Sequence, residues 1–211
     1  MVPEVRRSAG ALAGALFLTV CAPARADTAS WKYKYVAVVV QNSGAHRPNA
    51  MSLIELFRRL AASKPPVVTV SVIGFAPEFQ QLDEVRFARK VVRLLPDTVS
   101  AQDLREIVSE LVFHGPSPVF DAVADALDAA GEKESAVLVV SNGIDNASDV
   151  GFDDLMRRAE KAAIPIIVFY YPTNPPLNGD SRLRKLAKSS GGRFIDVRLR
   201  DSWEQLMAAL R

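Results

Sequence analysis

The residues in this chain that could do chemistry are two serines, the two histidines and one aspartate, and they fall into three short segments. They are Ser43 and His46 in residues 41–49, His114 and Ser117 in residues 114–117, and Asp145 in residues 141–149. A hydrolase uses serine, histidine and aspartate as nucleophile, base and orienting group. The two histidines with Asp145 could instead bind Zn²⁺ through three protein ligands and a water.

The local sequence around the serines gives little support to the hydrolase hypothesis. The chain has no Gly-x-Ser-x-Gly elbow, which presents a nucleophilic serine in many hydrolases. Ser117 precedes Pro118, and this pair is typical of a helix start with serine as N-cap and proline at the first helical position. We therefore expect Ser117 to cap a helix, and we expect no catalytic residues.

The elements that must position these residues can be predicted from the apolar pattern. Four short runs rich in Val and Ile are continuously apolar, and two weaker runs accompany them. The main runs are residues 35–40, 67–75, 136–140 and 164–171, and the weaker ones are residues 90–95 and 193–197. Continuous apolarity indicates strands covered on both faces, as in a parallel sheet between two helix layers.

Between the strands, apolar residues recur with the 3.6-residue period of amphipathic helices. The helical stripes span residues 53–61, 104–111, 119–130, 152–159, 183–187 and 203–210, with Trp203 on the core-facing side of the last. Each main strand is followed by a helix, which predicts an α/β fold with a doubly wound, mostly parallel sheet and helices on both faces. In such folds the loops after the carboxyl ends of the strands converge, so the three segments above should meet at one edge.

The motifs around Gln41, Ser117 and Asn142, in this order within residues 33–211, resemble those of the von Willebrand factor type A (VWA) domain family. Val38-Val39-Val40 runs into Gln41-Asn42-Ser43-Gly44-Ala45, where the family has a strand followed by Asp-x-Ser-x-Ser. Gly115-Pro116-Ser117-Pro118-Val119-Phe120-Asp121-Ala122 is similar to the family's Gly-Thr-Pro-Leu-Tyr-Asp-Ala, and Ser141-Asn142-Gly143 stands in the place of Thr-Asp-Gly. The order and spacing of these motifs together carry the resemblance.

The resemblance implies a metal-ion-dependent adhesion site on this face, but the ligand types have changed. The family's ligand positions are occupied here by Gln41, Ser43, Ala45, Ser117 and Asn142. Both carboxylates have become amides, which keep an oxygen but lose the negative charge that holds a hard cation. We therefore predict a degenerate site with no resident metal or other cofactor, and weak binding of Mg²⁺ or Zn²⁺ stays open.

On this basis we expect a protein-interaction module without catalysis. Its ligand-binding face would comprise Asn42, Ser43, His46, His114, Ser117 and Asp145. One alternative is a metal-dependent adhesion module in which Ser43, Ser117 and Asp145 ligate the ion with waters. The less favoured alternative is a hydrolase that uses Ser43 or Ser117, His46 or His114, and Asp145.

The first residues read as an export signal. Arg6 and Arg7 precede an apolar run at residues 9–20, and Ala24-Arg25-Ala26 offers small residues for cleavage. The run is too short to span a membrane. The predicted organisation is a signal peptide at residues 1–26, a short segment at 27–32 and the domain at 33–211, located in a periplasm or outside the cell. Cys21 follows Val20, where lipoprotein signals have a small residue, so lipidation is not expected.

Charge and cysteine content exclude several other classes. The chain has 26 Lys and Arg against 24 Asp and Glu, and its one cysteine lies in the predicted leader. Cleavage after Ala26 would remove three arginines and one glutamate, which leaves a mature chain without net charge. Such a chain has no cationic excess for nucleic acid and no cysteines for a disulfide framework. We expect a protein partner, no nucleic acid and no membrane-spanning segment.

Overall fold

The computed structural model describes residues 30–41, 50–65, 68–80, 84–94, 103, 106, 117–131, 134–172 and 180–211. The predicted signal peptide and most of the helix predicted at 104–111 lie outside the described residues. Among the described helices, none combines the length and the apolarity that crossing a membrane requires.

The described residues form a six-stranded sheet in the order β3-β2-β1-β4-β5-β6. The strands are β1 (Tyr35–Val40), β2 (Thr69–Gln80), β3 (Glu84–Leu94), β4 (Ser135–Ser141), β5 (Ile166–Tyr170) and β6 (Arg193–Asp196). Strands β2, β1, β4, β5 and β6 run parallel to their neighbours, and only β3 is antiparallel. The predicted mostly parallel α/β sheet is confirmed.

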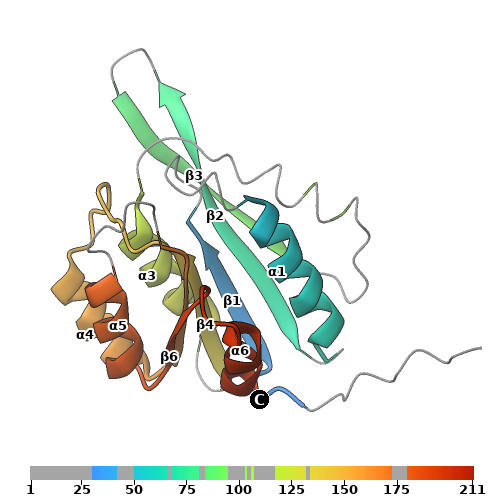
Figure 1. Cartoon of the computed structure of the whole chain (residues 1–211). Helices are drawn as coiled ribbons and strands as arrows, with labels where there is room; N and C mark the ends of the chain where they lie inside the picture. The colour runs from blue at the N-terminus through green and yellow to red at the C-terminus, as the bar shows by residue number, and fades with distance from the viewer. Residues whose placement is uncertain are drawn as a thin grey trace, which may run out of the picture.

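The β2–β3 hairpin departs from the predicted strand-helix alternation, because β2 is followed directly by β3 rather than by a helix. The weak strand predicted at 90–95 begins earlier, at Glu84, and pairs antiparallel with β2. β1 pairs with β2 only as far as Val39 and Ile73, and β2 continues to Gln80 with β3 as its partner. Figure 1 shows the hairpin extending past the end of β1.

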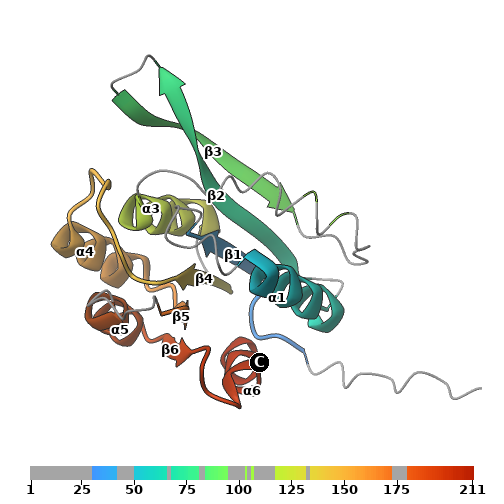
Figure 2. The same cartoon turned by 45° about the horizontal axis from the view of Figure 1, so that its top comes forward.

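Helices cover both faces of the sheet, as Figure 2 shows most clearly. They are α1 (Ala50–Ser63), α3 (Val119–Ala130), α4 (Phe152–Ala162), α5 (Asp180–Ser189) and α6 (Ser202–Leu210). Helices α1 and α6 pack with one apolar cluster, and α3, α4 and α5 with another. Alternate residues of β1 supply both: Val38 belongs to the first cluster and Val39 to the second. This two-sided burial explains why the central strands are continuously apolar.

The passage from α5 to β6 depends on two glycines. Gly191 has a φ of 72°, which closes the helix in the left-handed conformation that glycine adopts without strain. At Gly192 a Cβ would lie 2.0 Å from the carbonyl oxygen of Ile166, so only glycine lets β6 approach β5 here. The pair therefore fixes where β6 starts and where its carboxyl end lies.

Candidate functional site

The candidate site lies where the order of the strands reverses. From β1 the chain adds β2 and β3 on one side, and then returns to add β4, β5 and β6 on the other. The switch point is between β1 and β4, and the segments after their carboxyl ends begin at Gln41 and at Asn142. Ligands of doubly wound sheets bind at this kind of position.

A buried carboxamide, that of Gln41, joins the three segments of the site. Its Oε1 accepts hydrogen bonds from the hydroxyl of Ser141 at 2.6 Å and from the backbone N–H of Asn142 at 2.9 Å. Its Nε2 donates to Ser117 Oγ at 2.7 Å. The orientation of the amide is fixed, because a backbone N–H can only donate and must therefore face the oxygen. The amide NH₂ group thus points at Ser117.

Ser117 is buried at the start of the α3 segment, and its expected role as N-cap is wrong. Helix α3 begins at Val119, its N-cap is Pro118, and no side chain of the cap residue bonds the helix. The Ser117 hydroxyl is instead engaged by Gln41. The Ser117 backbone pairs with Asn146: its N–H donates to Asn146 Oδ1 at 2.7 Å, and its carbonyl accepts from the Asn146 N–H at 3.1 Å.

The first turn of α3 is capped from a distant part of the chain. Asp145 Oδ2 accepts the N–H of Phe120 at 2.8 Å, and Ser148 Oγ accepts the N–H groups of Phe120 and Asp121 at 3.0 and 3.1 Å. The Ser148 hydroxyl also donates to Asp145 Oδ2. A carboxylate at this position satisfies free backbone donors and interacts favourably with the helix dipole.

The contact between α3 and this loop runs in both directions. The carboxylate of Asp121, in the first turn of α3, accepts the backbone N–H groups of Asp149 and Val150 at 3.0 and 2.8 Å. The loop therefore caps the helix, and the helix holds the loop. Since Asp145 and Asp121 both have backbone partners, the loop after β4 has a defined conformation before any ligand arrives.

Asn142 adds a second amide to the centre of the site. Its Oδ1 accepts the N–H of Ile144 at 3.0 Å, closing a short turn at Gly143, whose φ is 78°. Its Nδ2 is buried and has no hydrogen-bond partner among the described residues. The hydrogens of an amide NH₂ group carry partial positive charge, so an unpaired one disfavours a cation nearby.

The described donor set does not fit a hard divalent cation. Gln41 turns its nitrogen toward Ser117, Asn142 uses its oxygen on Ile144, and Asp145 uses its carboxylate on α3. Mg²⁺ requires oxygen ligands, with carboxylates supplying charge. Within the part of the chain that the structure describes, no group of three or more His, Cys, Asp and Glu side chains is placed to hold a metal.

The structure brings together four of the residues singled out from the sequence, which are Gln41, Ser117, Asn142 and Asp145. The others lie outside the described residues, namely Asn42, Ser43, Ala45, His46 and His114. The zinc and hydrolase hypotheses depend on those residues and stay predictions. Ser141, Asn146 and Ser148 were missed, because their roles depend on partners far along the chain.

Comparisons with protein-family models and with curated proteins find no match. The fold itself defines the class of protein: a doubly wound α/β domain with a polar site at the switch point between β1 and β4. Among solved structures, one entitled von Willebrand factor type A from Catenulispora acidiphila is similar to this chain, with a TM-score of 0.52 and 14% identity. The match covers 84% of this chain and 42% of that chain.

This structural similarity supports, at the level of the fold, the resemblance to the VWA family that the loop motifs indicate. The fold is of the VWA type. This chain spans less than half the length of the matched protein, so the comparison extends to the domain and not to a whole activity.

Proposed function

We propose that the chain is an exported protein-interaction module that binds its partner without catalysis and without a tightly bound divalent cation. The observation that carries the proposal is the Gln41 carboxamide, which joins Ser117, Ser141 and Asn142 at the switch point. In the resembling family a carboxylate stands at the Gln41 position and helps to hold the ion. Here a neutral amide links the same segments directly.

The rigidity of the face favours recognition of a preformed surface. The loop after β4 is fixed by the caps that Asp145 and Ser148 place on α3, and by the return contacts of Asp121. A face whose groups are ordered before binding loses less conformational entropy when a partner docks. Ile144 is partly exposed on this loop and offers an apolar contact, and the same loop carries the exposed Asp149.

The absence of catalysis in the proposal rests on the surroundings of Ser117. Its hydroxyl is buried and accepts a hydrogen bond from an amide, whereas a nucleophilic serine needs a base that can take its proton. Export is proposed from the charged and apolar pattern of the leader, and it is tested by following cleavage after Ala26 in fractionated cells.

The test of partner binding immobilises the protein and measures how much of the partner protein it captures. The amount captured is compared between two surface variants. Ile144→Arg changes a partly exposed side chain and leaves the backbone contacts of residue 144 available. The matched control is Arg158→Glu, which reverses an exposed charge on α4. Arg158 lies near Pro165, which precedes β5 at the amino ends of the strands, away from the candidate site. We expect Ile144→Arg to lose the partner and Arg158→Glu to keep it, at equal stability of both variants.

Two results would contradict the proposal. Equal capture by both variants would place the interaction elsewhere or make it nonspecific. Loss of capture that follows only from unfolding, measured by circular dichroism of the same samples, would show that the β4–α4 loop makes no direct contact with a partner.

A further inference from the structure

A second feature of the same sheet edge is a cavity of about 440 Å³ between α1 and α6. It lies beside the carboxyl ends of β5 and β6, on the opposite face of the sheet from α3. Its lining comes from α1, from β5 and the residue after it, from the residue after β6 and from the start of α6. It includes Leu56, Phe169, Tyr171, Val197 and Trp203. The volume falls within the range of natural ligand pockets.

The walls of the cavity are mainly apolar and aromatic. Leu56, Phe169 and Tyr171 are almost fully buried and belong to the core, and the rings of Phe169 and Tyr171 meet edge to face at 5.6 Å. Burial raises the pKa of Tyr171 to about 12, so the phenol stays neutral. Val197 and Trp203 are only partly buried and pack against this core from the rim. Such walls fit an apolar side chain.

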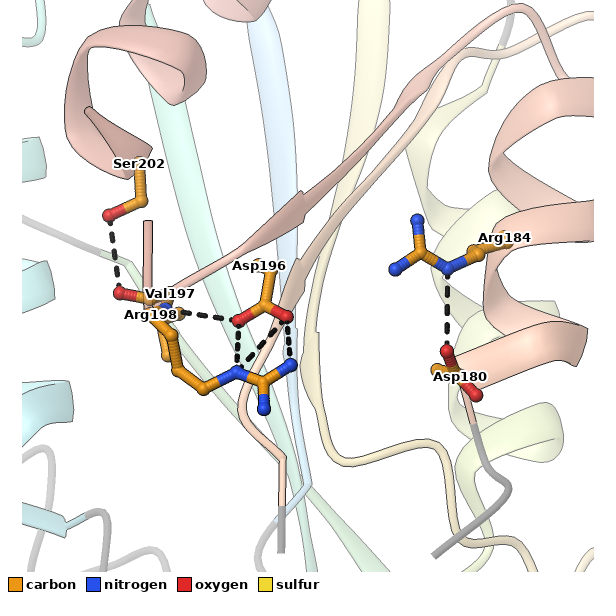
Figure 3. A network of polar contacts seen from close by, with 6 residues as sticks. All are labelled: Asp180, Arg184, Asp196, Val197, Arg198 and Ser202. Atoms are coloured by element: carbon orange, nitrogen blue, oxygen red, sulfur yellow. Dashed lines mark hydrogen bonds and ion pairs between the residues drawn. The ribbon is translucent and has the colours of Figure 1, made fainter. Parts of the chain in front are cut away.

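The segment between Val197 and Trp203 is held by its own contacts, drawn in Figure 3. Asp196, at the end of β6, accepts the backbone N–H of Arg198 and hydrogen bonds from its guanidinium. Ser202, the first residue of α6, donates to the carbonyl of Val197 at 3.5 Å. These contacts keep the rim in place beside the cavity.

The α1 side of the rim carries an excess of positive charge. The Glu55 carboxylate accepts hydrogen bonds of 2.7 Å from Arg58 and Arg59 together, so one negative group faces two positive ones. These bonds lower the pKa of Glu55 to about 2. The Arg59 guanidinium also lies over the ring of Trp203, 5.4 Å from its centroid, which places a cation against the aromatic rim.

The backbone also contributes positive charge at this cavity, through the N-termini of α1 and α6. Ser52 in the first turn of α1 and Ser202 at the start of α6 both line the cavity, and helix N-termini carry partial positive charge. The first turn of α1 has no acidic residue. The acidic residues at the start of α6, Asp201 and Glu204, are not among the lining residues, and Asp201 is bonded by Gln205.

We propose that this cavity receives an aromatic or branched aliphatic side chain of a protein partner that carries a carboxylate within reach of Arg59. The inference rests on the proposed function, because it names the chemistry of a partner segment. The apolar walls would bury the side chain, and the carboxylate would meet the positive charge that Glu55 leaves uncompensated. The partner would then contact two places on one sheet edge, the loop after β4 and this cavity.

The test uses N-acetyl-phenylalanine, which carries a ring and a carboxylate, and its uncharged amide as the matched probe. The readout is the indole N–H resonance of Trp203 in the full chain. The internal control is the resonance of Trp31, which precedes the amino end of β1 and is not among the lining residues of the cavity. We expect both probes to shift the Trp203 signal saturably, with the carboxylate binding about two- to fivefold more tightly, as for an exposed ion pair. The Trp31 signal should not move.

A pair of arginine variants tests the source of this preference. Arg59→Gln should remove most of the preference for the carboxylate probe, whereas Arg184→Gln should keep it. Arg184 is also an exposed helical arginine over an aromatic ring, that of Phe194, but it does not line the cavity. No shift of Trp203 with either probe, or equal behaviour of the two variants, would overturn the inference.

This outcome is separable from that of the proposed function. If a partner is captured through the Ile144 face while the probes leave Trp203 unmoved, the cavity inference fails and the interaction module stands. If the probes bind as expected but Ile144→Arg captures the partner as well as Arg158→Glu does, the loop face around Ile144 is not the binding surface. The cavity is then still supported as a binding site.

Discussion

The two parts of the sheet edge differ in how their polar groups are used. At the switch point, Gln41, Ser117 and Asn142 are buried, uncharged and bonded mostly to one another. At the α1–α6 cavity, the charges of Glu55 and Arg59 are exposed and the walls are apolar. Apart from the Asn142 side-chain nitrogen, the first region pairs its buried polar groups with one another, whereas the second presents apolar surface and a positive excess toward solvent.

This difference indicates that the first region stabilises the fold and that the second region is available to bind a ligand. Buried hydrogen bonds are costly to break, since each orphaned group loses its partner and cannot reach water. Exposed ion pairs contribute little to stability but can select a partner by charge. We therefore assign the switch point to organisation of the loop face, and the cavity to selection.

The largest expected effect of a substitution is at Gln41. Gln41→Ala would leave the N–H of Asn142 and the hydroxyls of Ser117 and Ser141 without this buried partner, and we expect a loss of about 3 kcal/mol or more in the free energy of unfolding. Arg59→Gln, at the cavity rim, should cost less than about 1 kcal/mol. Urea unfolding of both variants measures the difference. Similar losses for the two would remove the distinction between the regions.

The next effect concerns the distant cap of α3. Asp145→Ala would leave the N–H of Phe120 with only the weaker partner Ser148, and we expect a loss of about 1–2 kcal/mol. Asp149→Ala, in the same loop but exposed and engaged mainly through its backbone N–H, serves as the control and should cost less than about 0.5 kcal/mol. Thermal unfolding distinguishes them. An Asp145 variant as stable as the control would mean that the cap does not hold α3.

The smallest expected effect is the loss of stability at low pH that comes from the Asp196–Arg198 pair at the cavity rim. The pKa of Asp196 lies below its usual value because the Arg198 side chain donates hydrogen bonds to the carboxylate. The contribution of this pair to stability is present above the unfolded pKa, near pH 4, and is lost as the pH falls through the lower folded pKa. Stability should thus decrease as the pH falls below about 4, by less than about 1 kcal/mol for this partly exposed pair.

Arg198→Gln isolates this contribution. The variant should reduce the dependence of the unfolding free energy on pH below about 4, whereas the amide and hydroxyls centred on Gln41 do not titrate there. An unchanged slope in Arg198→Gln would show that the pair does not lower the pKa of Asp196.

Most of the central fold could be predicted from the sequence, because its signals are local. The run at residues 35–40 matches β1, and the apolar stripes match α3 and α4 within a few residues. The hairpin could not be predicted in the same way. β3 mixes apolar and charged residues without a regular period, and its antiparallel pairing with β2 depends on contacts that no local pattern encodes.

The candidate site was predictable in its location but not in its bonding. The motifs placed Gln41, Ser117 and Asn142 at one edge, and the structure brings them together. The local pattern Ser117-Pro118 predicted a helix cap, whereas tertiary contacts supply Asp145 and Ser148 instead. Trp203 was expected to face the core, and it does pack against the core, but it also lines a cavity that periodicity could not reveal.

The most direct test of the central claim is thermal unfolding of the chelator-treated protein, titrated separately with Mg²⁺, Mn²⁺, Ca²⁺ and Zn²⁺. A variant that restores both carboxylates, Gln41→Asp with Asn142→Asp, is the positive control, and its midpoint should rise with Mg²⁺. A ligand bound to the native state adds about 2.7 kcal/mol at one hundred times its dissociation constant. We predict no shift for the natural sequence. A saturable shift with Mg²⁺, Mn²⁺ or Ca²⁺ would contradict the account of a site held together by amides, whereas a shift with Zn²⁺ alone would point to His46 and His114.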